Sequence, residues 1–224
     1  MKLETLSCPD GSSTLYIPDM DETYHSRKGA LTESEYVYLQ QGLDFIQDDN
    51  IAILEFGLGT GLNALLSLQW ARNHHKILHY TTVEKHPLSL NDLASINYAE
   101  LLGMPNEWKN LHQSEWNQEI RWEDEHRLHK WQGDFVNLDY PSNRAHIVFY
   151  DAFAPSKQAE VWGIDYLKKA FEALKPGGML VTYCAQGQFK RNLKEIGFEV
   201  ETLKGPPGKT EMVRARKPTS SSDN

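Results

Sequence analysis

The stretch NIAILEFGLGTGLNALLSLQWARN, residues 50–73, contains the pattern that decides the fold. Its apolar run from Ile51 to Leu54 is typical of a buried parallel strand. A glycine-rich turn follows at residues 55–61, and leucines then recur at helical spacing as far as Trp70. A strand, a glycine turn and a helix in this order form the first unit of a nucleotide-binding α/β fold. Glycine is needed there because it permits positive φ and close approach of a ligand.

The rest of the chain continues the alternation of strands and helices. Short apolar runs predict further strands at residues 77–84, 145–151 and 178–184, and the stretch RLHKWQGDF, residues 127–135, leads to Asp134. Residues 159–174 carry apolar side chains at helical spacing and end at a Lys-Pro-Gly-Gly sequence. Residues 198–217 read as two strands joined by a Gly-Pro-Pro-Gly turn. The sequence therefore predicts an α/β fold with a mostly parallel seven-stranded sheet and an antiparallel C-terminal hairpin.

The length of 224 residues predicts a single domain, which we place at residues 1–217. An N-terminal extension covers about residues 1–45. The gap at about residues 88–132 is too long for one crossover helix and contains four of the six tryptophans, so we expect a helical insertion there. The polar tail, residues 218–224, is expected to be disordered.

Composition narrows the class of protein. Hydrophobic residues make up 40% of the chain and charged residues 24%, as in ordinary globular proteins, and no apolar run is long enough for a membrane span. The only cysteines, Cys8 and Cys184, are far apart and predict reduced thiols in a cytoplasmic protein. The nine histidines show no ligand spacing, so we propose no metal.

Charge is distributed unevenly along the chain. The net charge is −8, which argues against broad nucleic-acid binding, and residues 1–60 contain eleven acidic and three basic side chains. Residues 190–217 contain eight basic and four acidic side chains, and this local excess is what a selective RNA contact needs. A hairpin with ordinary solvated lysines is the alternative interpretation of the same composition.

The glycine turn does not match a dinucleotide-binding fingerprint, because Leu62 stands where a third spaced glycine is required. Its Glu-x-Gly-x-Gly-x-Gly pattern resembles the first motif of class I S-adenosylmethionine-dependent methyltransferases. That resemblance implies S-adenosyl-L-methionine as cofactor, with Glu84 on the ribose hydroxyls and Asp134 on the adenine amino group. The cofactor turn itself is expected to comprise Glu55, Gly57, Gly59, Gly61 and Asn63.

The stretch VFYDAFAPSK, residues 148–157, ends a predicted strand with a carboxylate, an aromatic ring and a proline. In this fold the strand ends beside the reacting methyl group, so we expect Asp151 to hold an acceptor amine and also to border the cofactor. Phe153 would stack on a planar base and Pro155 would fix the turn. A carboxylate of ordinary pKa is a weak base towards an amine, so we expect Asp151 mainly to bind and orient it. The alternative is that Asp151 caps a loop and Phe153 belongs to the core.

Four motifs together resemble the methyltransferase half of the bifunctional tRNA 5-methylaminomethyl-2-thiouridine biosynthesis protein, over residues 14–217. They are TYHSRKGALTESEYVYLQQGL, EFGLGTGLNALL, DAFAPSKQAEVW and the long segment that begins LKPGGMLVTYC. The resemblance implies an enzyme that methylates the aminomethyl group of wobble 5-aminomethyl-(2-thio)uridine in the anticodon stem-loop of tRNA. A separate enzyme would supply that group, because the chain resembles the stand-alone form. The substrate-binding residues expected on this basis are Tyr24, His25, Ser26, Lys157, Lys190 and Arg191.

Two other functions fit the same motifs. One is a class I methyltransferase, or an aminopropyl transferase of similar fold, that acts on a small amine. The other is a non-catalytic subunit that only binds S-adenosylmethionine. Intact glycines and an intact acceptor-side motif at Asp151 favour catalysis over the second alternative.

Overall fold

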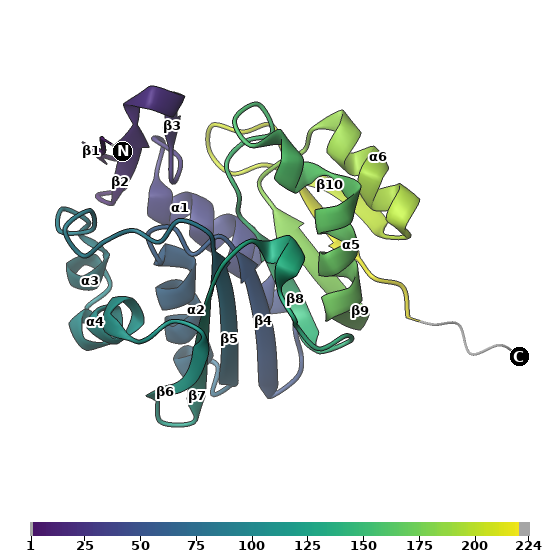
Figure 1. Cartoon of the computed structure of the whole chain (residues 1–224), viewed down its shortest axis with the longest axis horizontal. Helices are drawn as coiled ribbons and strands as arrows, with labels where there is room; N and C mark the ends of the chain where they lie inside the picture. Colours follow the sequence, from purple (N-terminus) through teal and green to yellow (C-terminus); the bar gives the residue numbers. More distant parts are fainter. Residues whose placement is uncertain (1, 220–224) are drawn as a thin grey trace, which may run out of the picture.

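The computed structural model describes residues 2–219, and the expected disorder of the tail falls largely outside these residues, at 220–224. An eight-stranded sheet forms the centre of the molecule, in the order β10-β11-β9-β8-β4-β5-β7-β6 (Figure 1). Its strands are β4 (Asn50–Phe56), β5 (Ile77–Glu84), β6 (Gln118–Glu123), β7 (His126–Gln132), β8 (Ala145–Tyr150), β9 (Leu174–Thr182), β10 (Glu199–Lys204) and β11 (Glu211–Arg216).

The five central strands, from β9 to β7, are parallel, which confirms the expected mostly parallel sheet. The C-terminal hairpin β10–β11 adds antiparallel strands next to β9 and confirms the prediction for residues 198–217. Because parallel neighbours share one direction, the ends of β4, β5, β7 and β8 meet at one edge of the sheet. That carboxyl edge is where a ligand site is expected in such a fold.

Helices cover both faces of the sheet. On one face lie α1 (Ala30–Ser34), its continuation through the π-helical turn Glu35–Gln40, and α2 (Leu62–Asn73). On the other face lie α5 (Ile164–Ala173) and α6 (Gly187–Ile196). The alternation along β4 explains the two cores: Ile51 and Ile53 pack on the α2 side, and Leu54 and Phe56 pack on the α5 side. None of the described helices is both long and apolar enough to cross a membrane.

The insertion at residues 88–132 is only partly helical, which corrects our expectation. Its helices are α3 (Tyr98–Leu101) and α4 (Pro105–Gln113), whereas residues 118–132 form the antiparallel hairpin β6–β7. The sheet therefore has eight strands rather than seven. β6 was missed because it is a short edge strand, mostly polar, whose partner lies across a tight turn.

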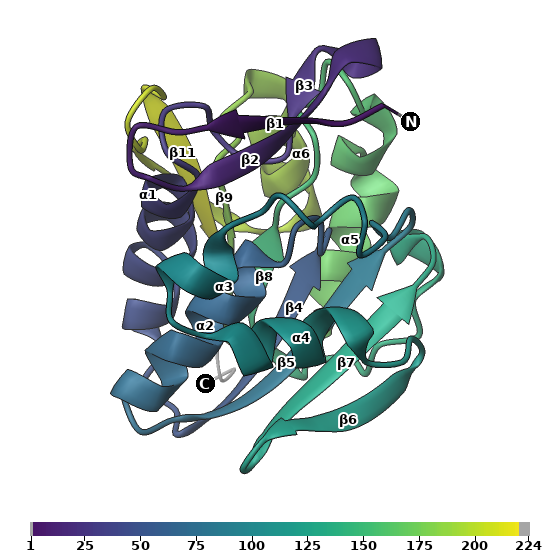
Figure 2. The ribbon, with the colours of Figure 1, turned by 90° about the vertical axis from the view of Figure 1, so that its left-hand side faces the viewer.

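The N-terminal extension contains a second, three-stranded antiparallel sheet of β1 (Glu4–Ser7), β2 (Ser13–Ile17) and β3 (Glu22–Thr23). Figure 2 shows this small sheet above the carboxyl edge of the parallel strands. The chain passes from β3 through residues 24–29 into α1. The extension therefore brings residues 24–33 to the edge where the central strands end.

Candidate active site

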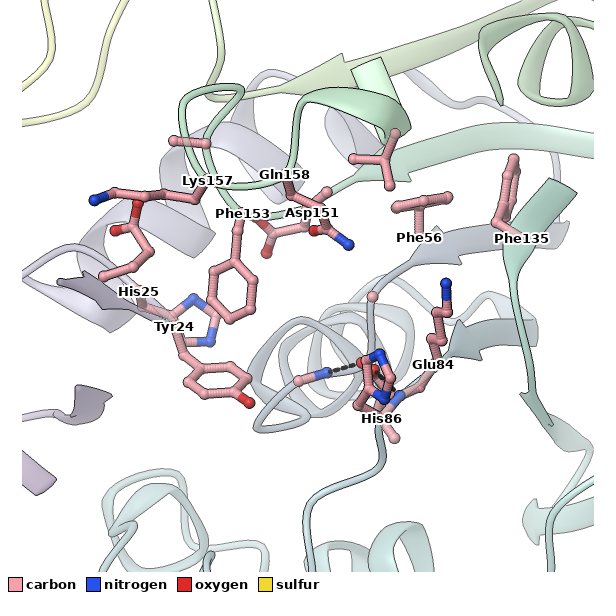
Figure 3. A pocket seen from close by; sticks show the side chains of 18 of the residues that line it. Tyr24, His25, Phe56, Glu84, His86, Phe135, Asp151, Phe153, Lys157 and Gln158 are labelled. Atoms are coloured by element: carbon pink, nitrogen blue, oxygen red, sulfur yellow. Dashed lines mark hydrogen bonds between the residues drawn. The ribbon is translucent and has the colours of Figure 1, made fainter. Parts of the chain in front are cut away.

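A cavity of about 550 Å³ opens at the carboxyl edge of the sheet (Figure 3). Its volume is in the range of sites that hold a small-molecule ligand. The ends of β4, β5, β7 and β8 contribute to its wall, together with residues 22–26 of the extension and Lys209 of the C-terminal hairpin turn. The predicted site residues that line it are Gly57, Gly59, Glu84, Asp134, Asp151, Phe153, Lys157, Tyr24, His25 and Ser26.

The glycine turn leaves β4 with a left-handed backbone, as its sequence requires. Gly57 has φ +91°, and a Cβ built there would lie 2.8 Å from the carbonyl oxygen of Asp151. Gly61 has φ +79°, and its Cβ would lie 2.7 Å from a methyl carbon of Leu111 in α4. The absence of a side chain at Gly57 therefore lets the ends of β4 and β8 pack together beside the cavity. At Gly61 it lets α4 of the insertion pack against the glycine turn, and Gly61 does not line the cavity.

Glu84 lies at the end of β5 with its carboxylate already fixed. The backbone N–H groups of Gly59 and His86 donate to its two oxygens, at 3.1 and 2.8 Å. A carboxylate offers about four lone-pair positions, so positions remain for donors inside the cavity. This geometry agrees with the expected role of holding a pair of hydroxyl groups.

Asp134 follows β7 and caps a short 3₁₀ turn. It accepts hydrogen bonds from the hydroxyl of Tyr166 at 2.7 Å and from the ammonium of Lys85 at 2.9 Å. Partial burial favours its neutral form, but these two hydrogen bonds outweigh burial and lower its pKa. Asp134 is therefore an acceptor, and the neighbouring rings of Phe56 and Phe135, 4.5 Å apart, give this end of the cavity an apolar wall.

Asp151 lies directly after β8, and its backbone N–H donates to the carbonyl of Phe56 at 3.1 Å. The side-chain amide of Asn63 donates to its carboxylate at 2.8 Å. Burial raises the pKa of Asp151, although the nearby His25 opposes the rise. Our assumption of an ordinary carboxyl pKa was therefore wrong, because no sequence pattern indicated this burial. The raised pKa makes Asp151 a stronger base than a surface aspartate.

Glu55 and Asn63 form a layer behind the cavity rather than part of its wall. Glu55 is fully buried between β4 and α2, and burial raises its pKa to about 8. Neither carboxyl oxygen forms a hydrogen bond with the described residues, and nor do the hydroxyls of Tyr80 and Thr82. The raised pKa favours the neutral form of Glu55, which is not part of the cavity wall.

The segment Tyr24–Ser26 enters the site from the N-terminal extension. The ring of Tyr24 packs edge-on against that of Phe153, with 5.1 Å between centroids, and lies over Gly59. His25 is buried, its pKa is lowered by burial, and its Nε2 lies 2.8 Å from the hydroxyl of Thr60 in the glycine turn. This segment lines the cavity and packs against the glycine turn. Its position therefore allows it to contact a ligand, to stabilise the turn, or both.

The wall residues that sequence reasoning missed include Glu33, Tyr183 and Lys209. The ammonium of Lys209 lies 2.5 Å from Glu33 and 3.6 Å from the centre of the Tyr183 ring. The Tyr183 hydroxyl donates to the carbonyl of Ala152 at 2.7 Å. The strand-end rule could have found Tyr183, which follows β9, but no sequence signal joins Glu33 to a lysine 176 residues away.

Three other predicted residues lie outside the cavity wall. Pro155 is in the loop after β8, two residues before the wall residue Lys157. Lys190 lies in α6 and pairs with Glu211 at 3.1 Å, and Arg191 is exposed and donates to Gln188. In the same basic stretch Arg214 is buried and pairs with Glu201. Part of the positive charge of residues 190–217 is therefore neutralised within the protein.

Comparison with known proteins identifies the family of the chain. Residues 102–218, just over half of the chain, match the model of a family described as S-adenosyl-L-methionine-dependent methyltransferase. The crystal structure of MNMC2 from Aquifex aeolicus superimposes with a TM-score of 0.78 at 25% identity, over 96% of this chain and 70% of that one.

Two curated relatives carry the name tRNA 5-methylaminomethyl-2-thiouridine biosynthesis bifunctional protein MnmC. The protein from Cupriavidus necator is 32% identical over 89% of this chain and 32% of its own length. The protein from Actinobacillus pleuropneumoniae is 30% identical over 95% of this chain and 35% of its own length. The chain thus spans about a third of the curated relatives it matches, and the resemblance seen in its motifs is confirmed.

Proposed function

Because this chain belongs to the S-adenosyl-L-methionine-dependent methyltransferase family, we propose that it methylates the aminomethyl group of a wobble 5-aminomethyl-(2-thio)uridine in tRNA. The names of its relatives support this choice of substrate. The observation that carries the proposal is Asp151, a carboxylate of raised pKa that faces the cavity at the end of a central strand. A carboxylate in this place suits a positively charged or hydrogen-bond-donating amine.

The residues present fit the cofactor of this family. Gly57 and Gly59 line the cavity, so the backbone of the glycine turn forms this part of the wall. Glu84 retains free lone pairs for ribose hydroxyls, and Asp134 can accept from an adenine amino group beside the rings of Phe56 and Phe135. When bound, S-adenosylmethionine supplies a methyl group on a positively charged sulfur.

The protein's own contribution to the reaction is to bind, orient and deprotonate the amine. Asn63 fixes one oxygen of Asp151, which leaves the other to accept a hydrogen bond from the substrate amine. The raised pKa of Asp151 lets it take a proton as the amine becomes nucleophilic. Phe153, braced edge-on by Tyr24, offers an aromatic face for the uracil ring. Holding the amine in line is worth at most about 7–11 kcal/mol of the barrier.

Two features of the proposal follow from its chemistry. The substrate already carries an aminomethyl group, so an enzyme of another reaction class must supply it. The RNA partner is the anticodon stem-loop of tRNA, and we expect the activity in the cytoplasm, where that RNA is found. The exposed cations of α6, the helix that follows β9, would provide a phosphate contact.

The decisive experiment is nucleoside analysis of tRNA incubated with this protein and S-adenosylmethionine labelled in its methyl group. Label in 5-methylaminomethyluridine or its 2-thio form is expected, and only in tRNA that carries the aminomethyl precursor. Polyamines assayed in parallel should remain unlabelled. Label in a polyamine instead, or binding of the cofactor with no transfer to any RNA, would replace this proposal with one of the two alternatives.

A further inference from the structure

The ion pair of Lys209 and Glu33 lies in the wall of the cavity, and the proposed function gives it no role. Glu33 is 6% exposed, and its second oxygen accepts from the backbone N–H of Ser26 at 2.9 Å. A buried carboxylate with both oxygens occupied is fixed in position. It therefore also fixes the ammonium of Lys209, which would otherwise be the end of a flexible side chain.

The backbone around Lys209 is equally constrained. Its N–H donates to the carbonyl of Pro206 at 2.9 Å, and that of Gly205 donates to Thr210 at 3.0 Å. Gly208 has φ +92°, and the Lys28 side chain packs so closely that a Cβ at Gly208 would lie 2.9 Å from it. The turn thus holds a lysine at a defined point of the cavity wall.

Lys209 lies on the acceptor side of the cavity. Its ammonium sits over the ring of Tyr183, and the hydroxyl of Tyr183 donates to the carbonyl of Ala152, the residue after Asp151. One aromatic side chain therefore separates Lys209 from the Asp151 loop. Glu84, the proposed ribose ligand, is held by the glycine turn at a different part of the wall.

An ammonium has three donors, and Glu33 and the face of Tyr183 do not use them all. Since Lys209 lines the cavity and its side chain is 30% exposed, a donor remains for the substrate. The pair with Glu33 has no net charge, so a phosphate brought to Lys209 would also meet a carboxylate. A neutral carbonyl oxygen fits this environment better than a phosphate oxygen.

Building on the proposed function, we propose that Lys209 is a specificity-determining residue that donates a hydrogen bond to the exocyclic oxygen at position 4 of the acceptor base. In uracil this oxygen is the neighbour of the aminomethyl-bearing carbon, so it lies beside an amine held by Asp151. Cytosine has an amino group at that position, and two donors would then face each other. The pair Glu33–Lys209 would thus select uridine over cytidine.

The test uses the full chain and two anticodon stem-loop RNAs, one with 5-aminomethyluridine and one with 5-aminomethylcytidine at the wobble position. Wild-type protein should favour the uridine RNA in kcat/KM by roughly ten- to a hundredfold. Lys209→Met should lose most of this preference because its rate on the uridine RNA falls more. Lys168→Met, at an exposed position of α5, should keep the wild-type ratio.

Other outcomes overturn the assignment. Equal losses on both RNAs would mean a structural role, and a flatter salt dependence of KM with an unchanged ratio would mean a phosphate contact. Cofactor binding by calorimetry reports whether each variant is folded. If Lys209→Met is not, Lys209→Arg keeps the ion pair but moves the donor, and an unchanged preference there would refute the proposal. Wild-type protein inactive on the uridine RNA would refute the proposed function itself.

Discussion

Asp151 shows how one residue's environment sets its chemistry. Burial raises its pKa, whereas His25, Tyr38 and Asn63 stabilise the charged form. The site is therefore arranged to keep Asp151 usable as a carboxylate while making it a better proton acceptor than in water. The sequence could predict the position of this acid at a strand end, but not its burial, which depends on side chains from α2 and the N-terminal extension.

The Asp151→Asn variant separates orientation from proton transfer. Asparagine still accepts a hydrogen bond from the amine but takes no proton, so we expect kcat to fall by about 10²-fold or more. The rise of kcat with pH that comes from deprotonation of the substrate amine should persist. Asp151→Ala should be slower still, since it loses the acceptor as well.

The measurement is kcat on tRNA from acid to alkaline pH for wild type and both variants, with cofactor affinity checked by calorimetry. Complete loss of the pH dependence in Asp151→Asn would show that Asp151 alone removes the proton. Full activity in Asp151→Ala would mean that the acceptor binds elsewhere.

Glu55 gives a prediction about stability. Its pKa is about 8 in the folded protein and 4.5 ordinarily, so between these values the folded state holds a proton that the unfolded state lacks. The contribution of Glu55 to stability should therefore be full below pH 4.5 and be lost as pH rises towards 8, by on the order of 5 kcal/mol in total.

Glu55→Gln should remove that component because glutamine does not titrate. We expect its melting temperature to fall less than that of wild type between pH 5 and pH 8.5, measured by calorimetry. Glu195→Gln, at an exposed position of α6, serves as the matched control and should follow the wild type. If the melting temperatures of Glu55→Gln and wild type change equally with pH, Glu55 is ionised in the folded protein.

At the scale of elements, the parallel strands β4, β5, β8 and β9 were predictable because each contains an apolar run that ends in a turn or an acid. The β6 strand and the N-terminal sheet were not, because short edge strands carry little apolar pattern and their pairing is decided by tertiary contacts. The residues of the candidate site also differ in whether the sequence could predict them. Strand-end acids such as Glu84 follow from topology, but Glu33 and Lys209 meet only after the extension and the hairpin fold against each other.

The Gly61→Ala variant tests how much the packing of α4 against the glycine turn contributes to stability. The substitution places a side chain at φ +79° and a Cβ 2.7 Å from Leu111, so both the backbone and the packing of α4 are strained. We expect a loss of about 2–4 kcal/mol in the free energy of unfolding, measured with urea.

Gly187→Ala is the matched control for this change. Gly187 begins α6, its φ is not positive, and the nearest atom to its Cβ would be the Arg191 guanidinium at 3.5 Å. Alanine there should be neutral or slightly stabilising. A loss in Gly61→Ala no larger than that of the control would mean that α4 moves away at little cost.

For the molecule as a whole, the negative net charge opposes the proposed binding of tRNA. The net charge is −8, and several cations of residues 190–217 are used inside the protein: Lys190 by Glu211, Lys209 by Glu33 and Arg214 by Glu201. The exposed cations that remain on α6 include Arg191 and Lys194, three positions apart and so neighbours on the helix surface. The proposed RNA-binding surface therefore contains fewer available cations than the sequence alone indicates.

Reversing Arg191 and Lys194 together to Glu should weaken tRNA binding without disturbing the hairpin, because neither forms an ion pair with the described residues. Lys190 is less suitable, since Glu in its place would face Glu211. We expect KM for tRNA to rise several-fold. The slope of log KM against the logarithm of salt concentration should flatten by about 0.7–0.9 for each phosphate that the variant no longer binds.

Reversal of Lys168 and Lys169 on α5 is the control for the change in total charge, and it should leave the slope unaltered. A slope that stays the same in the α6 variant would place the RNA contact on another part of the cavity rim, where Lys157 is exposed and forms no ion pair with the described residues.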